Sequence, residues 1–397
     1  MVCEFLERLT RTEVRALHKA WPAFQVCGCG GLALAILLAM ILTIDRNLSP
    51  VVMGGIVLVA IATFFVLVLA TKVITGEEKI IYYHHEIAVM VTATLLLWCW
   101  RQPVLPFLDI TILGVGLFLA CGRVGCFLVG CCHGRPHRWG VRYRKQHAEA
   151  GFTGYFVGVR LFPIQLTESL WVLFIVAVGV FAVLRGSPPG TALAWYVVTY
   201  DLGRFCFEFM RGDPDRAYLW GFSQPQWISA VLVALVVWLE QSGLLPLAGW
   251  HRLAVAFLGV AMLAIAARRW FQSEPKHRLL HPRHVGEIAR LIDALSIASP
   301  DNPRPFRWTV MAERMSRPEV IRIGNTSIGL QISTGEIVDR SGARVRHYTL
   351  SCRGREMSED LARLLARLIG QLRHHAGGPK LIKGDRGVFH ASFLKAE

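Results

Sequence analysis

Long apolar segments occupy roughly the first two thirds of the chain. Residues 24–44 and 51–71 are each 21 residues long and contain no charged side chain. About 20 consecutive apolar residues cross the hydrocarbon core of a bilayer as a helix. Gly and Pro residues separate eight apolar segments: 24–44, 51–73, 86–100, 104–122, 164–184, 190–210, 226–240 and 252–267. The pattern predicts an all-α polytopic membrane protein with seven to eight transmembrane helices, some of which are short for a full span.

The composition supports this class of fold. The chain is 53% hydrophobic and 18% charged, whereas a soluble globular protein is about 45–50% apolar and about 25% charged. Such a content of apolar residues excludes disorder over most of the length. Ten cysteines in 397 residues are too few for a small fold that depends on disulfides.

The N-terminal residues 1–23 mix basic and acidic side chains before the first apolar segment. A cleaved leader has a short apolar core and a small-residue cleavage site, and this stretch has neither. We expect an N-terminal interfacial segment, a short helix that leads into the first span.

The C-terminal residues 275–397 are polar, with 21 Lys and Arg against 12 Asp and Glu. Residues 326–340 and 345–352 alternate as strands do, and residues 357–374 have helical spacing behind Ser358 as an N-cap. The apolar face of that helix comprises Leu361, Leu364, Leu365, Leu368 and Leu372. We expect a small soluble α+β domain that contains no recognisable catalytic motif. Its basic surface would lie against anionic lipid, and nucleic acid is not expected as a partner.

Four polar stretches lie in or beside the apolar segments: residues 82–86, 122–136, 160–168 and 200–213. Charges in such places are costly, so they usually line a cavity or bind a substrate. In the first stretch, adjacent helical residues point in different directions, so at most one of His84 and His85 faces a given site. Alternatively, the tyrosines and histidines of this stretch lie at the level of the lipid headgroups.

The second stretch, GRVGCFLVGCCHGRP, combines two arginines, four glycines and three cysteines. Glycine lets the backbone approach a ligand closely, and the planar fork of arginine suits phosphate. The metal-ligating side chains in it are Cys126, Cys131, Cys132 and His133. A zinc site usually needs two separated ligand pairs, and no second pair is evident, so we expect no metal.

In the last stretch, four polar residues share one face of a helix: Tyr200, Arg204, Glu208 and Arg211. Their spacing of four, four and three residues follows the helical repeat. A structural ion pair explains Arg204 and Glu208 as well as function does. Arg211 and Arg123 have no evident local partner, and an anionic headgroup is their natural ligand.

These stretches resemble the prolipoprotein diacylglyceryl transferase family over about residues 76–240. The second stretch is similar to the family signature, a G-R-x-G-N-F-x-x-G-E run that ends in G-R. Residues 139–143 (WGVRY) and 162–169 (FPIQLTES) resemble the W-G-V and H-P-S-Q-L-Y-E runs that follow. YDLGRFCFEFMRGDP resembles Y-G-x-x-R-F-x-x-E-F-x-R, and Gln226 resembles the Gln that opens the seventh span. The order and spacing of four motifs make the resemblance specific.

The resemblance implies a transferase that moves a diacylglyceryl group from phosphatidylglycerol to the lipobox cysteine of a prolipoprotein, with glycerol phosphate as the leaving group. It implies that Arg123 and Arg211 hold the phosphate and that His84 or His85 is the catalytic base. The substrate-binding residues that carry over are Gly125, Gly134, Gln165, Glu168, Tyr200, Arg204 and Glu208. The expected partners are phosphatidylglycerol, a prolipoprotein and membrane lipids, with no cofactor. The transferase-like domain would comprise residues 24–268, between the segments 1–23 and 275–397, in a bacterial inner membrane.

The chain also departs from the family pattern. Cys126 and Cys131 stand where the family commonly has Asn and Glu. The run His84-His85-Glu86 stands where it has His-Gly-Gly. The eighth apolar segment and the C-terminal domain are additions.

The basic residues of the loops predict how the protein is oriented in the membrane. With eight spans, both termini and the loops 74–85, 123–163 and 211–225 share one side, which is richer in Lys and Arg than the other. The positive-inside rule places that side in the cytoplasm, whereas the family's active site opens to the outside. If the eighth apolar segment does not span, the C-terminal domain is cytoplasmic and the family orientation is kept. We expect the family orientation.

Two other functions fit the same residues. One is a related transferase with a different acceptor, in which Cys131 or Cys132 is a covalent nucleophile. The other is a phospholipid-binding membrane anchor for the C-terminal domain, without turnover.

Overall fold

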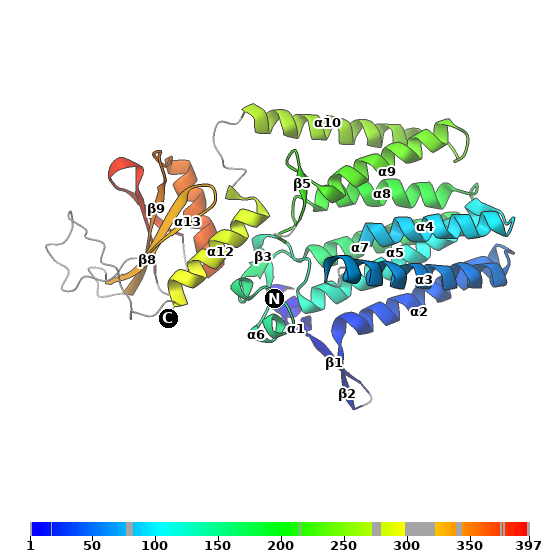
Figure 1. Cartoon of the computed structure of the whole chain (residues 1–397), viewed down its shortest axis with the longest axis horizontal. Helices are drawn as coiled ribbons and strands as arrows, with labels where there is room; N and C mark the ends of the chain where they lie inside the picture. The colour runs from blue at the N-terminus through cyan, green and yellow to red at the C-terminus, as the bar shows by residue number, and fades with distance from the viewer. Residues whose placement is uncertain are drawn as a thin grey trace.

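The computed structural model describes residues 2–16, 18–76, 82–213, 216–271, 279–297, 322–338, 344–373, 375 and 378–394. A bundle of long helices forms one end of the molecule, and a smaller mixed α/β region forms the other (Figure 1). The expected fold class, a polytopic helical membrane protein with a small soluble α+β region, is confirmed.

All eight apolar segments are helices, and α5 lies in the middle of the bundle. Fifteen of the 26 residues of α5 are buried, and it packs against α2, α4, α7 and α8. Of the described helices, α2, α3, α5, α7 and α10 are long and apolar enough to cross a membrane. The bundle comprises α2 (Ala23–Asp45), α3 (Pro50–Thr75), α4 (Tyr82–Cys99), α5 (Val104–Val129), α7 (Ile164–Leu184), α8 (Thr191–Phe207), α9 (Gln224–Gln241) and α10 (Gly249–Phe271).

Local sequence sets several of the helix ends. Ser49 Oγ accepts a hydrogen bond from the Val52 N–H, and Pro50 follows at the first helical position of α3. Gly130 ends α5 with φ 89°, a left-handed conformation that glycine adopts at little cost. A tertiary contact sets another end, because buried Asp109 of α5 accepts hydrogen bonds from Gly190 N and Leu193 N, both at 2.7 Å, and so caps α8.

Short elements gather at the end of the bundle nearer the α/β region. The N-terminal segment is only partly the expected helix: α1 (Val2–Leu9) ends early, and an antiparallel hairpin leads into α2. The hairpin consists of β1 (Glu13–Ala16) and β2 (Lys19–Pro22). Between α5 and α7 lie β3 (Pro136–Arg142), α6 (Lys145–Glu149), η1 (Gly154–Phe156) and β4 (Arg160–Leu161), and β5 (Tyr218–Leu219) and β6 (Phe222–Ser223) precede α9.

The C-terminal region is an antiparallel sheet of strand order β10-β11-β9-β8-β7 with two packed helices. The predicted helix is α13, and Ser358 Oγ accepts from the Leu361 N–H at 3.3 Å, as expected of an N-cap. The expected strands are β8 and β9, whereas α12 and the strands β7, β10 and β11 were not predicted from the sequence. The elements are α12 (Pro282–Ile297), β7 (Arg322–Asn325), β8 (Leu330–Val338), β9 (Arg344–Cys352), α13 (Glu359–Arg373), β10 (Lys380–Lys383), η3 (Asp385–Gly387) and β11 (Phe389–Leu394).

The C-terminal region packs on the loop between α5 and α7. Leu279 and Ile288 belong to the same apolar core as Tyr143 and Phe156 of that loop. Arg283 donates a hydrogen bond to the backbone carbonyl of Arg216, in the loop before α9. The predicted boundary between 268 and 275 falls largely on residues outside the described part of the chain, and the domain limits stay a prediction.

Candidate functional site

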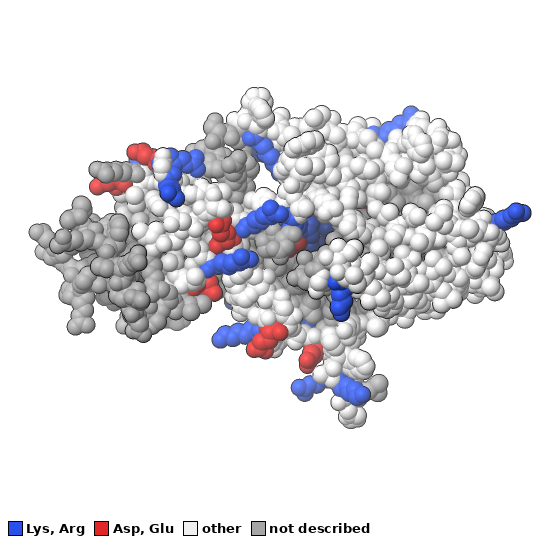
Figure 2. All heavy atoms as spheres, in the orientation of Figure 1, with Lys and Arg blue, Asp and Glu red and all other residues white. Residues whose placement is uncertain are grey.

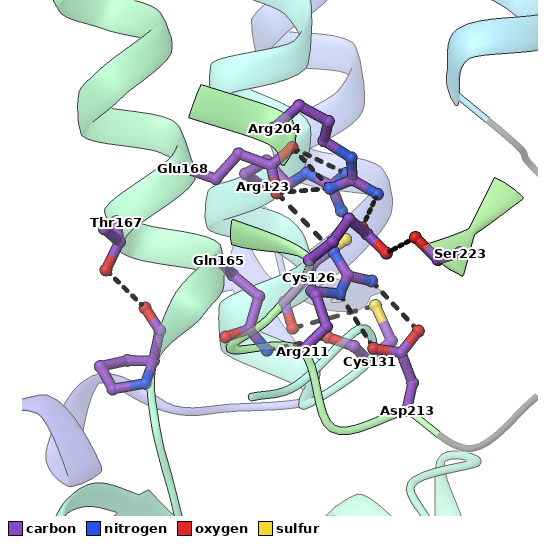
Figure 3. Close-up of polar contacts among 12 residues, drawn as sticks. Arg123, Cys126, Cys131, Gln165, Thr167, Glu168, Arg204, Arg211, Asp213 and Ser223 are labelled. Carbon is purple, nitrogen blue, oxygen red and sulfur yellow. Dashed lines mark hydrogen bonds and ion pairs between the residues drawn. The ribbon is translucent and has the colours of Figure 1, made fainter. Parts of the chain in front are cut away.

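Glu168 is the centre of a buried cluster of charges where four helix ends meet. It lies near the start of α7 and is completely buried. Its Oε1 is 3.0 Å from Arg123 Nη2, on α5, and 3.1 Å from Arg204 Nη1, on α8. Its Oε2 is 3.7 Å from Arg211 Nη1. Three arginines from three parts of the chain thus face one carboxylate (Figure 3).

A second carboxylate extends the cluster along α8. Glu208 Oε1 is 2.7 Å from Arg204 Nη2, one helical turn away, which confirms the predicted pair. Glu208 also pairs with Arg216 and accepts a hydrogen bond from Ser223 Oγ at 2.8 Å. Ser223 caps α9 in a reciprocal arrangement with Gln226, so the start of α9 is tied to the cluster.

Arg211 lies beyond the end of α8, yet only 1% of it is exposed. Its Nε and Nη2 donate to Asp213 at 2.9 and 3.3 Å. Its backbone forms an isolated β-bridge with Gly134. A Cβ on Gly134 would lie 2.4 Å from the carbonyl oxygen of Phe162, so only glycine fits this approach of three backbone segments.

The charges do not balance. Hereafter "the ion-pair cluster" means Arg123, Glu168, Arg204, Glu208, Arg211, Asp213 and Arg216. Four guanidinium groups face three carboxylates in it, which leaves one excess positive charge. Within the described part of the chain, Arg123 Nε and Arg211 Nη1 are buried without a hydrogen-bond acceptor. The cluster therefore has both the charge and the free donors to hold one anionic group.

The electrostatics of Asp213 follow from its neighbours. Burial alone would raise the pKa of this carboxyl group, but the charges of Arg211 and Arg216 outweigh burial and hold the pKa below its usual value. Asp213 is therefore ionised at neutral pH, and it keeps the Arg211 side chain in place.

The two predicted histidines lie at the start of α4. His84 is exposed, and its ring packs edge-on against Tyr83 with centroids 4.5 Å apart. His85 is buried, and its ring centroid lies 4.9 Å from that of Phe64 on α3. Tyr83 interacts electrostatically with Arg204, Arg216 and Glu208, so the start of α4 borders the ion-pair cluster.

The other predicted residues fall into two groups. Tyr200 donates to Glu168 Oε1 at 3.2 Å, and Gln165 Nε2 donates to the Cys131 carbonyl at 2.8 Å, so both lie at the cluster. Gly125 instead lies against α2, where a Cβ would come within 3.1 Å of Cys27 Cβ. It lets two helices approach, and the structure shows no contact between it and the described arginines.

Sequence reasoning missed Asp213, Arg216 and Ser223 as members of the site. The run R-G-D-P-D-R after α8 carries the first two, but loop residues have no periodicity that would reveal a shared face. One signal in the sequence could have indicated them: this run carries charges of both signs directly after a buried helix end.

The three cysteines of the second polar stretch also converge. The Sγ atoms of Cys126, Cys131 and Cys132 all lie within 4.8 Å of one another. Arg123 and Arg211 interact electrostatically with this group of thiols.

A buried, positively charged cluster at one end of a bundle of apolar helices defines a multi-pass membrane protein with an internal polar site. Residues 81–240 match the family model described as prolipoprotein diacylglyceryl transferase. The resemblance to this family that the four motifs indicate is thereby confirmed over these residues, and the name of the family is that of a transferase.

Individual relatives carry the same name. The phosphatidylglycerol–prolipoprotein diacylglyceryl transferase of Clostridium tetani is 29% identical over 143 residues, which are 35% of this chain and 55% of the relative. That of Dehalococcoides mccartyi is 29% identical over 42% of this chain and 61% of the relative. A second such enzyme of Streptomyces coelicolor is 29% identical over 52% of this chain and 53% of the relative. The chain spans about half the length of the curated relatives it matches.

Proposed function

We propose that this protein transfers a diacylglyceryl group from phosphatidylglycerol to the lipobox cysteine thiol of a prolipoprotein and releases glycerol phosphate. The observation that carries the proposal is the excess positive charge of the ion-pair cluster, together with Arg123 Nε and Arg211 Nη1, which have no hydrogen-bond acceptor. The motif match over residues 81–240 supplies the substrate class.

The reaction breaks the carbon–oxygen bond between the diacylglyceryl group and the phosphate, and a carbon–sulfur bond forms. The phosphate gains a negative charge as the phosphodiester becomes a phosphomonoester. Arg123 and Arg211 stabilise this charge, because their guanidinium groups already lie in a site from which water is excluded. Glu168 contacts both arginines and fixes their spacing.

The acceptor thiol is a good nucleophile once it has lost its proton. His84 or His85 at the start of α4 would take that proton. The proton then leaves with the released glycerol phosphate. The apolar helices around the cluster would admit the acyl chains from the bilayer. The enzyme would act in the bacterial inner membrane, with prolipoprotein and phosphatidylglycerol as its substrates.

The test uses purified protein, phosphatidylglycerol vesicles and a lipobox peptide whose mass is followed over time. The expected result is a gain of one diacylglyceryl unit on the peptide cysteine. Arg123→Ala and Arg211→Ala should each lower the rate at least about 100-fold, by analogy with the removal of one charge-stabilising donor.

Arg185→Ala is the matched control, because Arg185 lies at the opposite end of α7 over the ring of Phe181. It should keep the full rate. Wild-type rates in either cluster variant would refute the phosphate-binding role. Intact lipid that stays bound without transfer would favour the membrane-anchor function instead.

A further inference from the structure

The three cysteines between the end of α5 and β3 have no part in the transfer reaction described above. Cys126 lies in the last turn of α5, and Cys131 and Cys132 follow Gly130, which ends the helix. Gly130 and Cys132 both have positive φ, 89° and 54°. The chain therefore turns sharply back, and two consecutive cysteines reach the same place as a third one from the preceding helical turn.

The spacing of the sulfur atoms fits one metal ion. The three Sγ atoms lie within 4.8 Å of one another. Zinc–sulfur bonds of about 2.3 Å in tetrahedral geometry place sulfurs roughly 3.8 Å apart. The sulfur atoms therefore need to approach one another by at most about 1 Å. The present contact of Cys131 Sγ is weak, a 3.9 Å hydrogen bond to the Cys126 carbonyl, and a metal–thiolate bond would readily replace it.

The charges around the thiols also favour the binding of a metal ion. Arg123 and Cys126 are three residues apart on α5, so the thiols lie beside the positively charged cluster. Three thiolates and one divalent cation together carry one negative charge. The ion-pair cluster carries one excess positive charge. These opposite charges attract one another, which favours a metal ion bound beside the cluster.

We propose that Cys126, Cys131 and Cys132 form a binding site for one thiophilic divalent cation of the zinc class. Three protein ligands leave the fourth tetrahedral position for water, as in zinc sites with an open position. Binding releases the thiol protons, and no oxidant or reductant is needed. The site is separate from the acceptor thiol, which belongs to the prolipoprotein.

The test uses the full-length chain in detergent, reduced, freed of metal and without lipid. Titration with Cd²⁺ should give a thiolate-to-metal charge-transfer absorption that saturates at one equivalent per chain. The chain loaded with Zn²⁺ should lack this absorption and gain it when Cd²⁺ is added, because the softer Cd²⁺ replaces Zn²⁺ on thiolates. A variant with Cys126→Ser, Cys131→Ser and Cys132→Ser should lose the saturable absorption.

The matched control carries Cys29→Ser, Cys99→Ser and Cys206→Ser, three exposed cysteines elsewhere in the bundle, and should bind as the wild type does. In addition, saturating Zn²⁺ should slow alkylation of Cys131 by iodoacetamide and leave alkylation of Cys29 unchanged. Alkylation is followed by peptide mass in the wild-type chain, so this readout does not depend on whether the serine variant folds. Absence of a saturable equivalent in the wild type, or equal alkylation of Cys131 with and without Zn²⁺, would overturn the proposal.

Discussion

At the scale of single residues, Glu168 is the residue that holds three arginines of the site together. It is completely buried and contacts Arg123, Arg204 and Arg211. Removal of a buried carboxylate that compensates several guanidinium groups strongly destabilises the protein, because the positive charges left behind have neither water nor a partner.

We expect Glu168→Gln to lower the free energy of unfolding by about 3–5 kcal/mol, the usual cost of removing one member of a buried ion pair. Thermal unfolding of the detergent-solubilised protein measures this loss. The double variant Arg123→Ala with Glu168→Gln should recover part of the stability, because one of the uncompensated charges is gone. If the double variant loses the sum of the two single losses, the two residues are not coupled and the pairing has no energetic consequence.

At the scale of elements, the site depends on the close approach of three loop segments. Gly134 forms a β-bridge with Arg211, and the Gly134 N–H donates to the Phe162 carbonyl at 3.1 Å. These contacts join the ends of α5, α7 and α8 and fix the backbone of Arg211, while Asp213 holds its side chain.

Gly134→Ala should therefore lower the rate of lipid transfer at least about 10-fold, because a Cβ lies 2.4 Å from the Phe162 carbonyl and must push the segments apart. The peptide-mass assay measures the rate. Gly122→Ala is the matched control, since Gly122 belongs to the same sequence stretch but a Cβ there meets nothing within 4 Å. Equal rates for the Gly134 variant and the wild type would show that Arg211 does not need this bridge.

At the scale of the whole molecule, the charged cluster and the C-terminal region share one end. The blue and red charged side chains gather near the junction of the two parts, and the far end of the bundle is largely uncharged on the visible face (Figure 2). Arg283 and Arg290 of α12 contact the backbone of Arg216 and the hydroxyl of Tyr155, respectively, in loops near the cluster. If all eight helices of the bundle cross the membrane, the chain returns to this end, and we expect both parts on one side of the bilayer.

This arrangement predicts the outcome of a reporter experiment. Reporters inserted in α6 (Lys145–Glu149) and fused after residue 397 should report the same side of the membrane. A reporter inserted between α7 and α8, at residues 185–190, should report the opposite side. Transfer to a secreted prolipoprotein requires the first two to be extracytoplasmic, against the positive-inside rule. A cytoplasmic result for them would contradict that acceptor and leave the geometry of the cluster unaffected.

Local sequence determined much of this protein. The apolar segments predicted all eight long helices, because the length and hydropathy of a helix are properties of contiguous residues. The pair Arg204–Glu208 and the cap at Ser358 were likewise predictable, because helical spacing and capping operate over four residues or fewer. The motifs of residues 122–136 and 200–213 were sufficient to recognise the family.

Only the tertiary structure decided which polar residues meet. It placed Glu168 between arginines from two other helices and a loop, and it added Asp213 and Arg216 to the cluster. It also brought Cys126 next to Cys131 and Cys132, through a turn in which Cys132, unlike Gly130, has a left-handed conformation that its residue type does not indicate. Such contacts depend on how helices pack and how loops close, and the free energy of those arrangements is shared among residues far apart in the chain. No local pattern therefore reveals them.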